Sequence, residues 1–210
     1  MKGKFLSFEG IDGCGKSTQL RLLASDLRMR GFDVITTREP GGTPFGNRLR
    51  EVLLDVEEQV DPLAELLVFA ADRAQHVRKQ IRPAIETGRI VLSDRYADAT
   101  AAYQGEGRGF AKRTVNMAIQ LATSGLKPDL TLLFDLPVEI ALSRTKQRHD
   151  DGYKADRLDI EDMGFYERVR QAYLNIATAE PERIRIIDAN QAVEDIHAQM
   201  TKIVNEFLER

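Results

Sequence analysis

The sequence predicts an α/β fold in which five parallel strands form a sheet with helices on both faces. Short apolar runs alternate with longer stretches of helical periodicity along the 210 residues, and glycines or prolines separate them. Strands that alternate with helices favour a parallel sheet, because each parallel connection needs a crossover segment. No internal repeat or linker divides the chain, so we expect one domain over residues 1–210.

The first two strands are predicted near the N-terminus. Residues 5–9 are a short apolar run that glycines follow directly, and residues 34–37 are the next such run. Between them, residues 16–30 carry leucines at helical spacing, and Gly31 closes this helix. The two prolines and three glycines of residues 38–46 predict a loop.

The middle of the chain is predicted to hold a long helix, a strand and another helix. Asp61 is a typical N-cap and Pro62 a typical first-turn residue, and Gly88 ends the helical pattern that they begin. Residues 90–92 are the third strand, and residues 112–123 are helical.

The remaining elements continue the alternation of strand and helix. Polar residues 149–154 contain Asp150-Asp151-Gly152 and predict a mobile loop. The other predictions are a strand at 129–134, helices at 137–148 and 165–179, a strand at 183–188 and a helix at 193–208.

Composition excludes several classes of partner and site. The chain has 30 Lys and Arg against 33 Asp and Glu, a net charge of −3, which disfavours a nucleic-acid polymer as partner. The single cysteine rules out an internal disulfide, and no Cys/His cluster suggests zinc. The N-terminus has no apolar signal core, and no apolar run is long enough to span a membrane. We expect a soluble, cytoplasmic domain with small-molecule partners.

One segment predicts nucleotide binding. Residues 10–17 match G-x-x-x-x-G-K-[ST] between a predicted strand and a predicted helix. Glycines let backbone N–H groups approach phosphate oxygens, Lys16 can reach the β- and γ-phosphates, and the Ser17 hydroxyl can bind Mg²⁺. This predicts a P-loop NTPase fold. The expected ATP-binding residues are Gly10, Ile11, Asp12, Gly13, Cys14, Gly15, Lys16, Ser17 and Thr18.

Arginines follow the predicted strands where ligands bind in parallel sheets. Arg38 follows the second strand, and Asp94 and Arg95 follow the third. Asp94 can hold Mg²⁺ through water, and an arginine can clamp phosphate, although a surface ion pair would leave the same pattern. Two phosphate-binding sites favour phosphoryl transfer between nucleotides over hydrolysis. Arg144, Arg148 and Arg157 bracket the polar loop and could neutralise a transferring phosphoryl group, but an exposed basic helix end explains them equally well.

These motifs together resemble the bacterial thymidylate kinase family over nearly the whole chain. The resemblance rests on Phe8-Glu9-Gly10-Ile11-Asp12-Gly13, Arg38-Glu39-Pro40-Gly41-Gly42-Thr43, Asp94-Arg95-Tyr96, Tyr103-Gln104-Gly105 and Lys127-Pro128-Asp129-Leu130-Thr131. It implies transfer of a phosphoryl group from ATP to dTMP with Mg²⁺, giving ADP and dTDP for dTTP biosynthesis. It also implies a homodimer.

The resemblance further implies residue roles. Asp12 would accept a hydrogen bond from the dTMP 3′-hydroxyl, and Arg38 and Arg95 would hold the acceptor phosphate. Tyr103 would pack where a ribose 2′-hydroxyl would lie and so exclude it. Phe69 would stack on thymine while Arg73 and Thr100 read its edge. The full implied sets are Asp12, Arg38, Phe69, Arg73, Arg95, Thr100, Tyr103 and Gln104 for dTMP, Lys16, Arg95 and Arg148 for catalysis, and Ser17 and Asp94 for the metal. From the residues alone, Phe69 and Tyr103 would be interpreted as core or half-buried residues.

Cys14 distinguishes two subtypes of the family. Some members carry a catalytic arginine at this P-loop position, whereas others place arginines in a lid, here residues 144–158. Arg148 is then the first candidate and Arg144 the second. Two alternatives remain: another P-loop kinase that acts on a different nucleotide or a nucleoside, and a nucleotide-dependent switch. The Arg38 loop and the Phe69/Arg73 pair argue against a switch, which needs no second nucleotide pocket.

Overall fold

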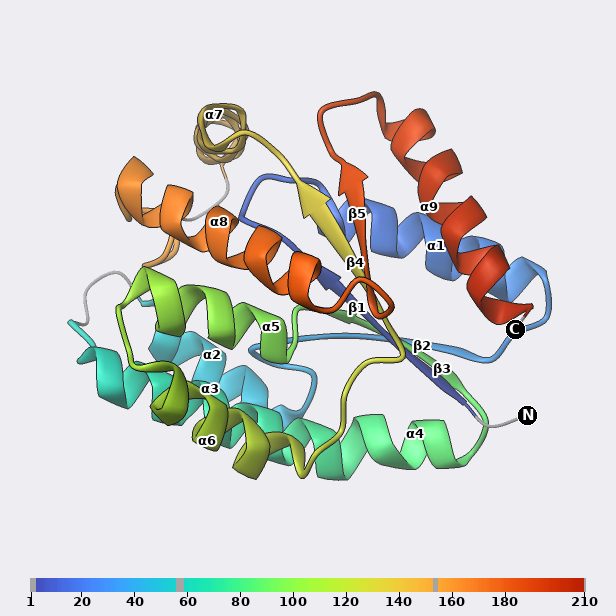
Figure 1. The fold of residues 1–210 in the computed structure, drawn as a ribbon, viewed down its shortest axis with the longest axis horizontal. Coiled ribbons are helices and arrows are strands. Elements are labelled where there is room, and N and C mark those ends of the chain that lie inside the picture. The colour runs from blue at the N-terminus through green and yellow to red at the C-terminus, as the bar shows by residue number, and fades with distance from the viewer. Residues whose placement is uncertain (1–2, 56–58, 153–154, 210) are drawn as a thin grey trace.

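The computed structural model describes residues 3–55, 59–152 and 155–209. In these residues five strands form one sheet in the order β2-β3-β1-β4-β5, and every neighbouring pair is parallel, which confirms the predicted α/β architecture (Figure 1). The strands are β1 (Lys4–Glu9), β2 (Val34–Arg38), β3 (Ile90–Asp94), β4 (Leu130–Asp135) and β5 (Ile184–Asp188).

The helices include three segments that the sequence analysis did not predict: α2, α5 and η2. The helical elements are α1 (Lys16–Met29), α2 (Pro44–Leu54), α3 (Pro62–His76), the π-helical η1 (Val77–Ile81), α4 (Arg82–Glu86), α5 (Ala97–Thr100), the π-helical η2 (Ala101–Gly107), α6 (Lys112–Thr123), α7 (Val138–Asp150), α8 (Met163–Ala179) and α9 (Val193–Leu208).

Helix α2 begins inside the segment predicted as a loop. The side chain of Thr43 caps it by accepting a hydrogen bond from the Gly46 backbone N–H, and Pro44 occupies its first position. The prolines and glycines that suggested a continuous loop therefore include a helix start. The long predicted helix after Asp61 is present as α3, η1 and α4 in succession, with Asp61 as its N-cap.

The sheet has an apolar core on each face. Helices α1 and α9 cover one face, whereas α3, η1, α4, α5 and α8 lie on the other (Figure 1). Successive strand residues alternate between these cores. Leu6 and Leu92 pack in the cluster that contains the leucines of α1, and Phe5 and Val91 pack in a separate cluster beneath η1 and α4.

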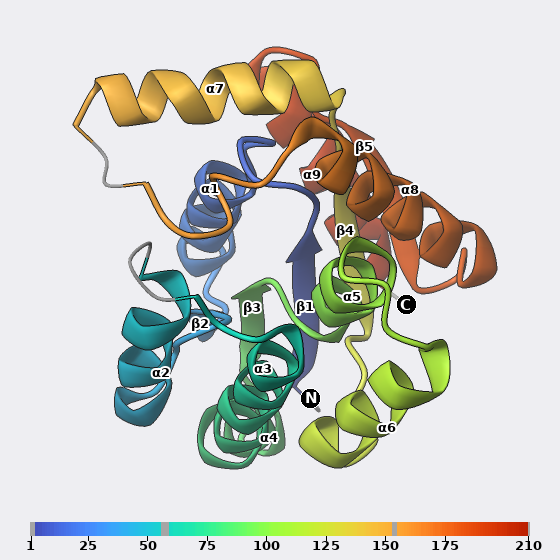
Figure 2. The same ribbon diagram turned by 90° about the vertical axis from the view of Figure 1, so that its left-hand side faces the viewer.

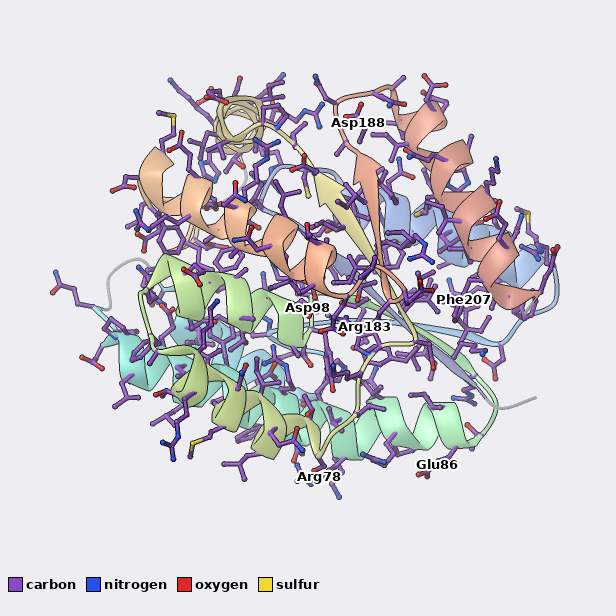
Figure 3. The ribbon with its side chains drawn as sticks, in the orientation of Figure 1. Arg78, Glu86, Asp98, Arg183, Asp188 and Phe207 are labelled. Carbon is purple, nitrogen blue, oxygen red and sulfur yellow. The ribbon has the colours of Figure 1, made fainter. Side chains whose placement is uncertain are left out.

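A partly buried ion pair holds α5 against the sheet. Arg183, just before β5, donates two hydrogen bonds to the Asp98 carboxylate of α5, at 2.7 and 2.9 Å (Figure 3). Arg183 also donates to Thr131 Oγ1 on β4 at 2.8 Å. Because α5 carries Thr100, this pair positions one of the predicted site residues.

Polar residues gather where the strands end. The register aligns Arg38 with Asp94 and Asp135 with Asp188, so their carboxyl ends meet at one edge of the sheet. Figure 2 shows α7 lying across this end of the molecule. Ligands of open α/β sheets bind at this edge, so the fold places the predicted motifs together. Across the described ranges, no helix has the length and apolar content to cross a membrane.

Candidate active site

The phosphate-binding loop joins β1 to α1 and is closed by its own lysine. Gly10, Gly13 and Gly15 have φ values of 138°, 81° and 90°, which L-residues rarely adopt. The buried Lys16 Nζ donates to the backbone oxygens of Gly10 and Ile11 at 3.0 and 2.9 Å. The predicted cradle is therefore formed, with a positive charge at its centre.

Replacing Gly13 with alanine should separate the loop from α7. A Cβ atom at Gly13 would lie 2.3 Å from the Ala141 carbonyl oxygen and 3.0 Å from Thr145 Oγ1. We expect ATP affinity in Gly13→Ala to fall by about tenfold or more, since the backbone must shift to relieve this clash. Isothermal titration with an ATP analogue measures it. Gly31→Ala is the matched control: its φ is also positive, at 85°, but nothing lies within 4 Å, so ATP affinity should stay unchanged.

The two predicted metal ligands face each other. Ser17 Oγ donates to Asp94 Oδ2 at 2.5 Å, across the junction of the loop and β3. Mg²⁺ is usually held by one or two protein oxygens together with phosphate oxygens and water, so this pair fits the ion. Within the described ranges, no group of three His, Cys, Asp or Glu side chains forms a metal cage.

Arg95 lies between the phosphate-binding loop and η2. Its guanidinium donates to the Gly10 oxygen at 3.0 Å, to Asp12 Oδ1 at 2.7 Å and to the Tyr103 hydroxyl at 3.0 Å. Tyr103 in turn donates to Asp12 Oδ2 at 2.9 Å. Burial raises the pKa of the Asp12 carboxyl, but the charges of Arg95 and Lys16 outweigh it and hold that pKa well below its usual range. Asp12 is therefore an ionised hydrogen-bond acceptor.

Glu9 supports the turn that carries Arg95. Arg95 has a φ of 71°, a strained conformation for a residue with a side chain. The fully buried Glu9 accepts the backbone N–H of Tyr96 at 2.7 Å and the hydroxyl of Tyr173 at 2.8 Å. Burial and the nearby Asp98 charge raise the pKa of Glu9 to about 7. Glu9, at the end of β1, thus stabilises the turn that carries Arg95.

A pocket opens beside Arg95, and we call it the acceptor pocket. All the residues expected to bind dTMP line it except Arg38, which is exposed nearby. Phe69, interpreted from its apolar surroundings as core, is only half-buried here. The lining residues are Asp12, Glu39, Pro40, Arg50, Leu54, Phe69, Arg73, Arg95, Ala99, Thr100, Tyr103, Gln104, Asp156 and Leu158.

Buried hydrogen bonds hold Arg73 in one orientation at the pocket wall. Its Nε donates to Glu39 Oε2 at 2.7 Å, its Nη1 to Thr100 Oγ1 at 2.8 Å and its Nη2 to the Tyr96 oxygen at 2.9 Å. Three of its five N–H groups are used in this way, and the others remain donors for a ligand. Thr100 therefore acts in this structure by orienting Arg73.

The buried Asp72, which accepts from the Gly41 backbone N–H, should make stability depend on pH. Burial and the Glu39 charge raise its pKa from 3.8 to about 7. A raised pKa stabilises the fold at low pH, and this stability is lost as pH rises from about 4 to about 7. Asp72→Asn stays neutral and can still accept the Gly41 N–H. We expect this variant to be more stable than the parent at pH 8 by roughly 1–4 kcal/mol, measured by urea unfolding, and to differ little at pH 4.

The control for this measurement is the exposed Asp33. Its substitution by asparagine should change stability by less than about 0.5 kcal/mol at either pH. An Asp72→Asn variant that follows the same pH dependence as the parent protein would contradict the assignment.

Arg50 is a site residue that the sequence analysis missed. It lies on α2, donates to the Pro40 oxygen at 3.1 Å and lines the acceptor pocket. Burial and the neighbouring Arg38 charge lower its pKa. The sequence analysis did not predict α2. It therefore gave no helix face on which Arg50 could be placed. Glu39 was noted only as part of a motif, and Asp156 was covered only by the range of the predicted lid, residues 144–158.

The arginines of the predicted lid have different surroundings. Ala141 and Thr145 of α7 lie against Gly13, and Arg148 Nη2 donates to Thr145 Oγ1 at 3.1 Å, one turn from the phosphate-binding loop. Arg144 reaches the Ala189 oxygen at 3.4 Å. Arg157 instead binds Glu65 Oε2 and the Leu53 oxygen, beside the acceptor pocket. Residues 153–154 of the predicted loop lie outside the described residues.

Comparison with known proteins connects this geometry to one family. The family model for thymidylate kinase matches residues 8–200. The chain is 48% identical to a thymidylate kinase of Desulfovibrio desulfuricans over 98% of its length and 97% of the relative. It is 47% identical to a thymidylate kinase of Pseudomonas syringae pv. tomato, over 100% of this chain and 98% of the relative. A solved thymidylate kinase structure from Ehrlichia chaffeensis superposes with a TM-score of 0.80 and 33% identity, over 98% of this chain and 99% of that one. With its phosphate-binding loop, Arg95 and acceptor pocket in this arrangement, the chain belongs to the thymidylate kinase family.

Proposed function

We propose that this protein transfers the γ-phosphoryl group of ATP to dTMP, giving ADP and dTDP for dTTP synthesis. The supporting observation is that Arg95 lies between two sites, a phosphate-binding loop and a pocket that combines an aromatic ring with fixed polar groups. A hydrolase or a switch needs the first site only. Phe69 would stack on the thymine base, and Arg73 and Gln104 would bind its edge.

In this proposal, an oxygen of the dTMP phosphate attacks the γ-phosphorus in line. That phosphate is already ionised at neutral pH, so the reaction needs no strong general base. Catalysis then consists of positioning and charge neutralisation. Lys16 would hold the β- and γ-phosphates, Arg95 would lie between donor and acceptor, and Arg148 would neutralise the transferring group. Arg38 and Arg50 would bind the acceptor phosphate from the α2 side of the pocket.

Mg²⁺ would be held by Ser17 and, directly or through water, by Asp94. It would neutralise charge on the phosphates. Asp12 accepts one hydrogen bond from Arg95 on Oδ1 and one from Tyr103 on Oδ2, so each carboxylate oxygen keeps an acceptor site for the dTMP 3′-hydroxyl. Tyr103 would then pack against the sugar.

We also propose a cytoplasmic homodimer. The supporting feature is an exposed apolar surface on α3 and α6, two helices that pack together. Its side chains are Leu63, Leu67, Met117 and Leu121, which are 48%, 57%, 57% and 74% exposed. Equilibrium sedimentation of the parent and of Leu67→Glu tests it, since a charge in the interface should favour the monomer.

A substrate panel tests the proposed reaction. With ATP and Mg²⁺, dTMP should be phosphorylated with a higher kcat/KM than other nucleoside monophosphates and than thymidine. Preference for another monophosphate, or for thymidine, would favour a different P-loop kinase. ATP turnover without an acceptor, together with no dTMP binding, would favour a nucleotide-dependent switch.

A further inference from the structure

Glu65 is a buried carboxylate that none of the roles proposed above uses. It lies in the first turn of α3 and is 1% exposed. Gln104 Nε2 donates to its Oε1 at 2.8 Å, and Arg108 and Arg157 donate to its Oε2 at 3.1 and 2.5 Å. Burial raises the pKa of Glu65, but these hydrogen bonds outweigh it and lower that pKa below the usual value. Glu65 is therefore ionised and can only accept hydrogen bonds.

An ionised Glu65 determines which way the Gln104 amide faces. Because a carboxylate accepts only, the amide must turn its NH₂ group toward Glu65 and its carbonyl oxygen away. Among the described residues, none donates a hydrogen bond to Gln104 Oε1. Gln104 is part of the acceptor-pocket wall, so its carbonyl is an acceptor that the protein leaves for the ligand.

This acceptor complements the donor Arg73. A thymine ring presents an N3–H donor between two carbonyl acceptors, whereas cytosine presents an N3 acceptor beside an amino donor. Arg73 can only donate, and Gln104 Oε1 can only accept. The pair matches the alternation on thymine and opposes that on cytosine, since the wrong base would leave buried polar groups unpaired.

We propose that Glu65 is a positioning residue for base specificity: it holds the Gln104 amide so that the pocket accepts the N3–H of thymine and rejects cytosine. The proposal rests on the proposed function. Arg157 extends the effect, because it binds the same carboxylate while its neighbours Asp156 and Leu158 line the pocket. The Glu65 carboxylate therefore holds both Gln104, which would bind the base, and the segment that follows α7.

The test is the ratio of kcat/KM for dTMP to kcat/KM for dCMP. A glutamine at position 65 can donate as well as accept, which lets the Gln104 amide rotate. We expect Glu65→Gln to lower the ratio about tenfold while KM for ATP changes less than twofold. Glu161→Gln is the matched control: it removes the other carboxylate bound to Arg108, at 2.6 Å, but touches neither Gln104 nor Arg157. Its ratio should equal that of the parent.

A second background shows whether Glu65 acts through Gln104. Gln104→Leu should itself lower the ratio, and adding Glu65→Gln to it should produce no further change. If Glu65→Gln lowers kcat/KM for dTMP and for dCMP by the same factor, the ratio is unchanged. Glu65 then has a structural role only, and the proposal is overturned. If Glu65→Gln does not fold, Gln104→Leu decides: an unchanged ratio overturns the proposal. Failure of the proposed function is distinct, because the parent protein would then show no preference for dTMP.

Discussion

Arg148→Ala should lower kcat by about 10³–10⁵ and change KM for ATP only a few-fold. The reason is that an arginine that binds the transferring phosphoryl group acts mainly in the transition state. Arg148 is bonded to Thr145, and Thr145 lies against Gly13 of the phosphate-binding loop. We therefore expect α7 to supply the charge that neutralises the transferring group. Single-turnover kinetics with saturating ATP and dTMP measure the effect.

Lys146→Ala is the matched control for Arg148→Ala. It removes one exposed positive charge from the same helix, next to Thr145. Its kcat should stay within about threefold of the parent, because a general loss of positive potential is screened by salt. An Arg148→Ala variant with normal kcat and a raised KM for ATP would show that Arg148 binds ATP without acting on the transition state.

Lys16→Ala should lower kcat by about 10²–10³ or more and weaken ATP binding. Its ammonium group is the buried cation of the phosphate-binding loop. A fixed charge in a buried, low-dielectric site stabilises the transition state far more than the same charge does in water. Steady-state kinetics give the effect on turnover, and titration with an ATP analogue gives the effect on binding.

The same variant contains an internal control. Lys16 does not line the acceptor pocket, so the Kd for dTMP should change less than twofold. A large loss of dTMP binding in Lys16→Ala would mean that the two sites are not separate, and a kcat within tenfold of the parent would contradict the role of Lys16 in transfer.

Local patterns were sufficient for the sheet and for the phosphate-binding loop. Short apolar runs predicted all five strands of the described ranges, and the match at residues 10–17 predicted a cradle that is present. Both depend on neighbours in sequence: the period of apolar residues, and the glycines that permit unusual φ values. Helix α2 was not predicted because its start lies among prolines and glycines that favour a loop. Helix α5 was not predicted because it has only four residues and depends on contacts with distant residues, such as that of Asp98 with Arg183.

What the sequence by itself determined was the fold class, the nucleotide chemistry and, through a resemblance, the family. Only the tertiary structure decided which side chains meet. It places Glu9 beneath the Arg95 turn, directs Arg157 to Glu65 rather than toward the phosphate-binding loop, and brings Arg50 to the acceptor pocket. These partners are far apart in the chain, and a buried charge must be paired wherever packing brings it. No local pattern encodes that choice, because the partner of each charge is set by the whole fold.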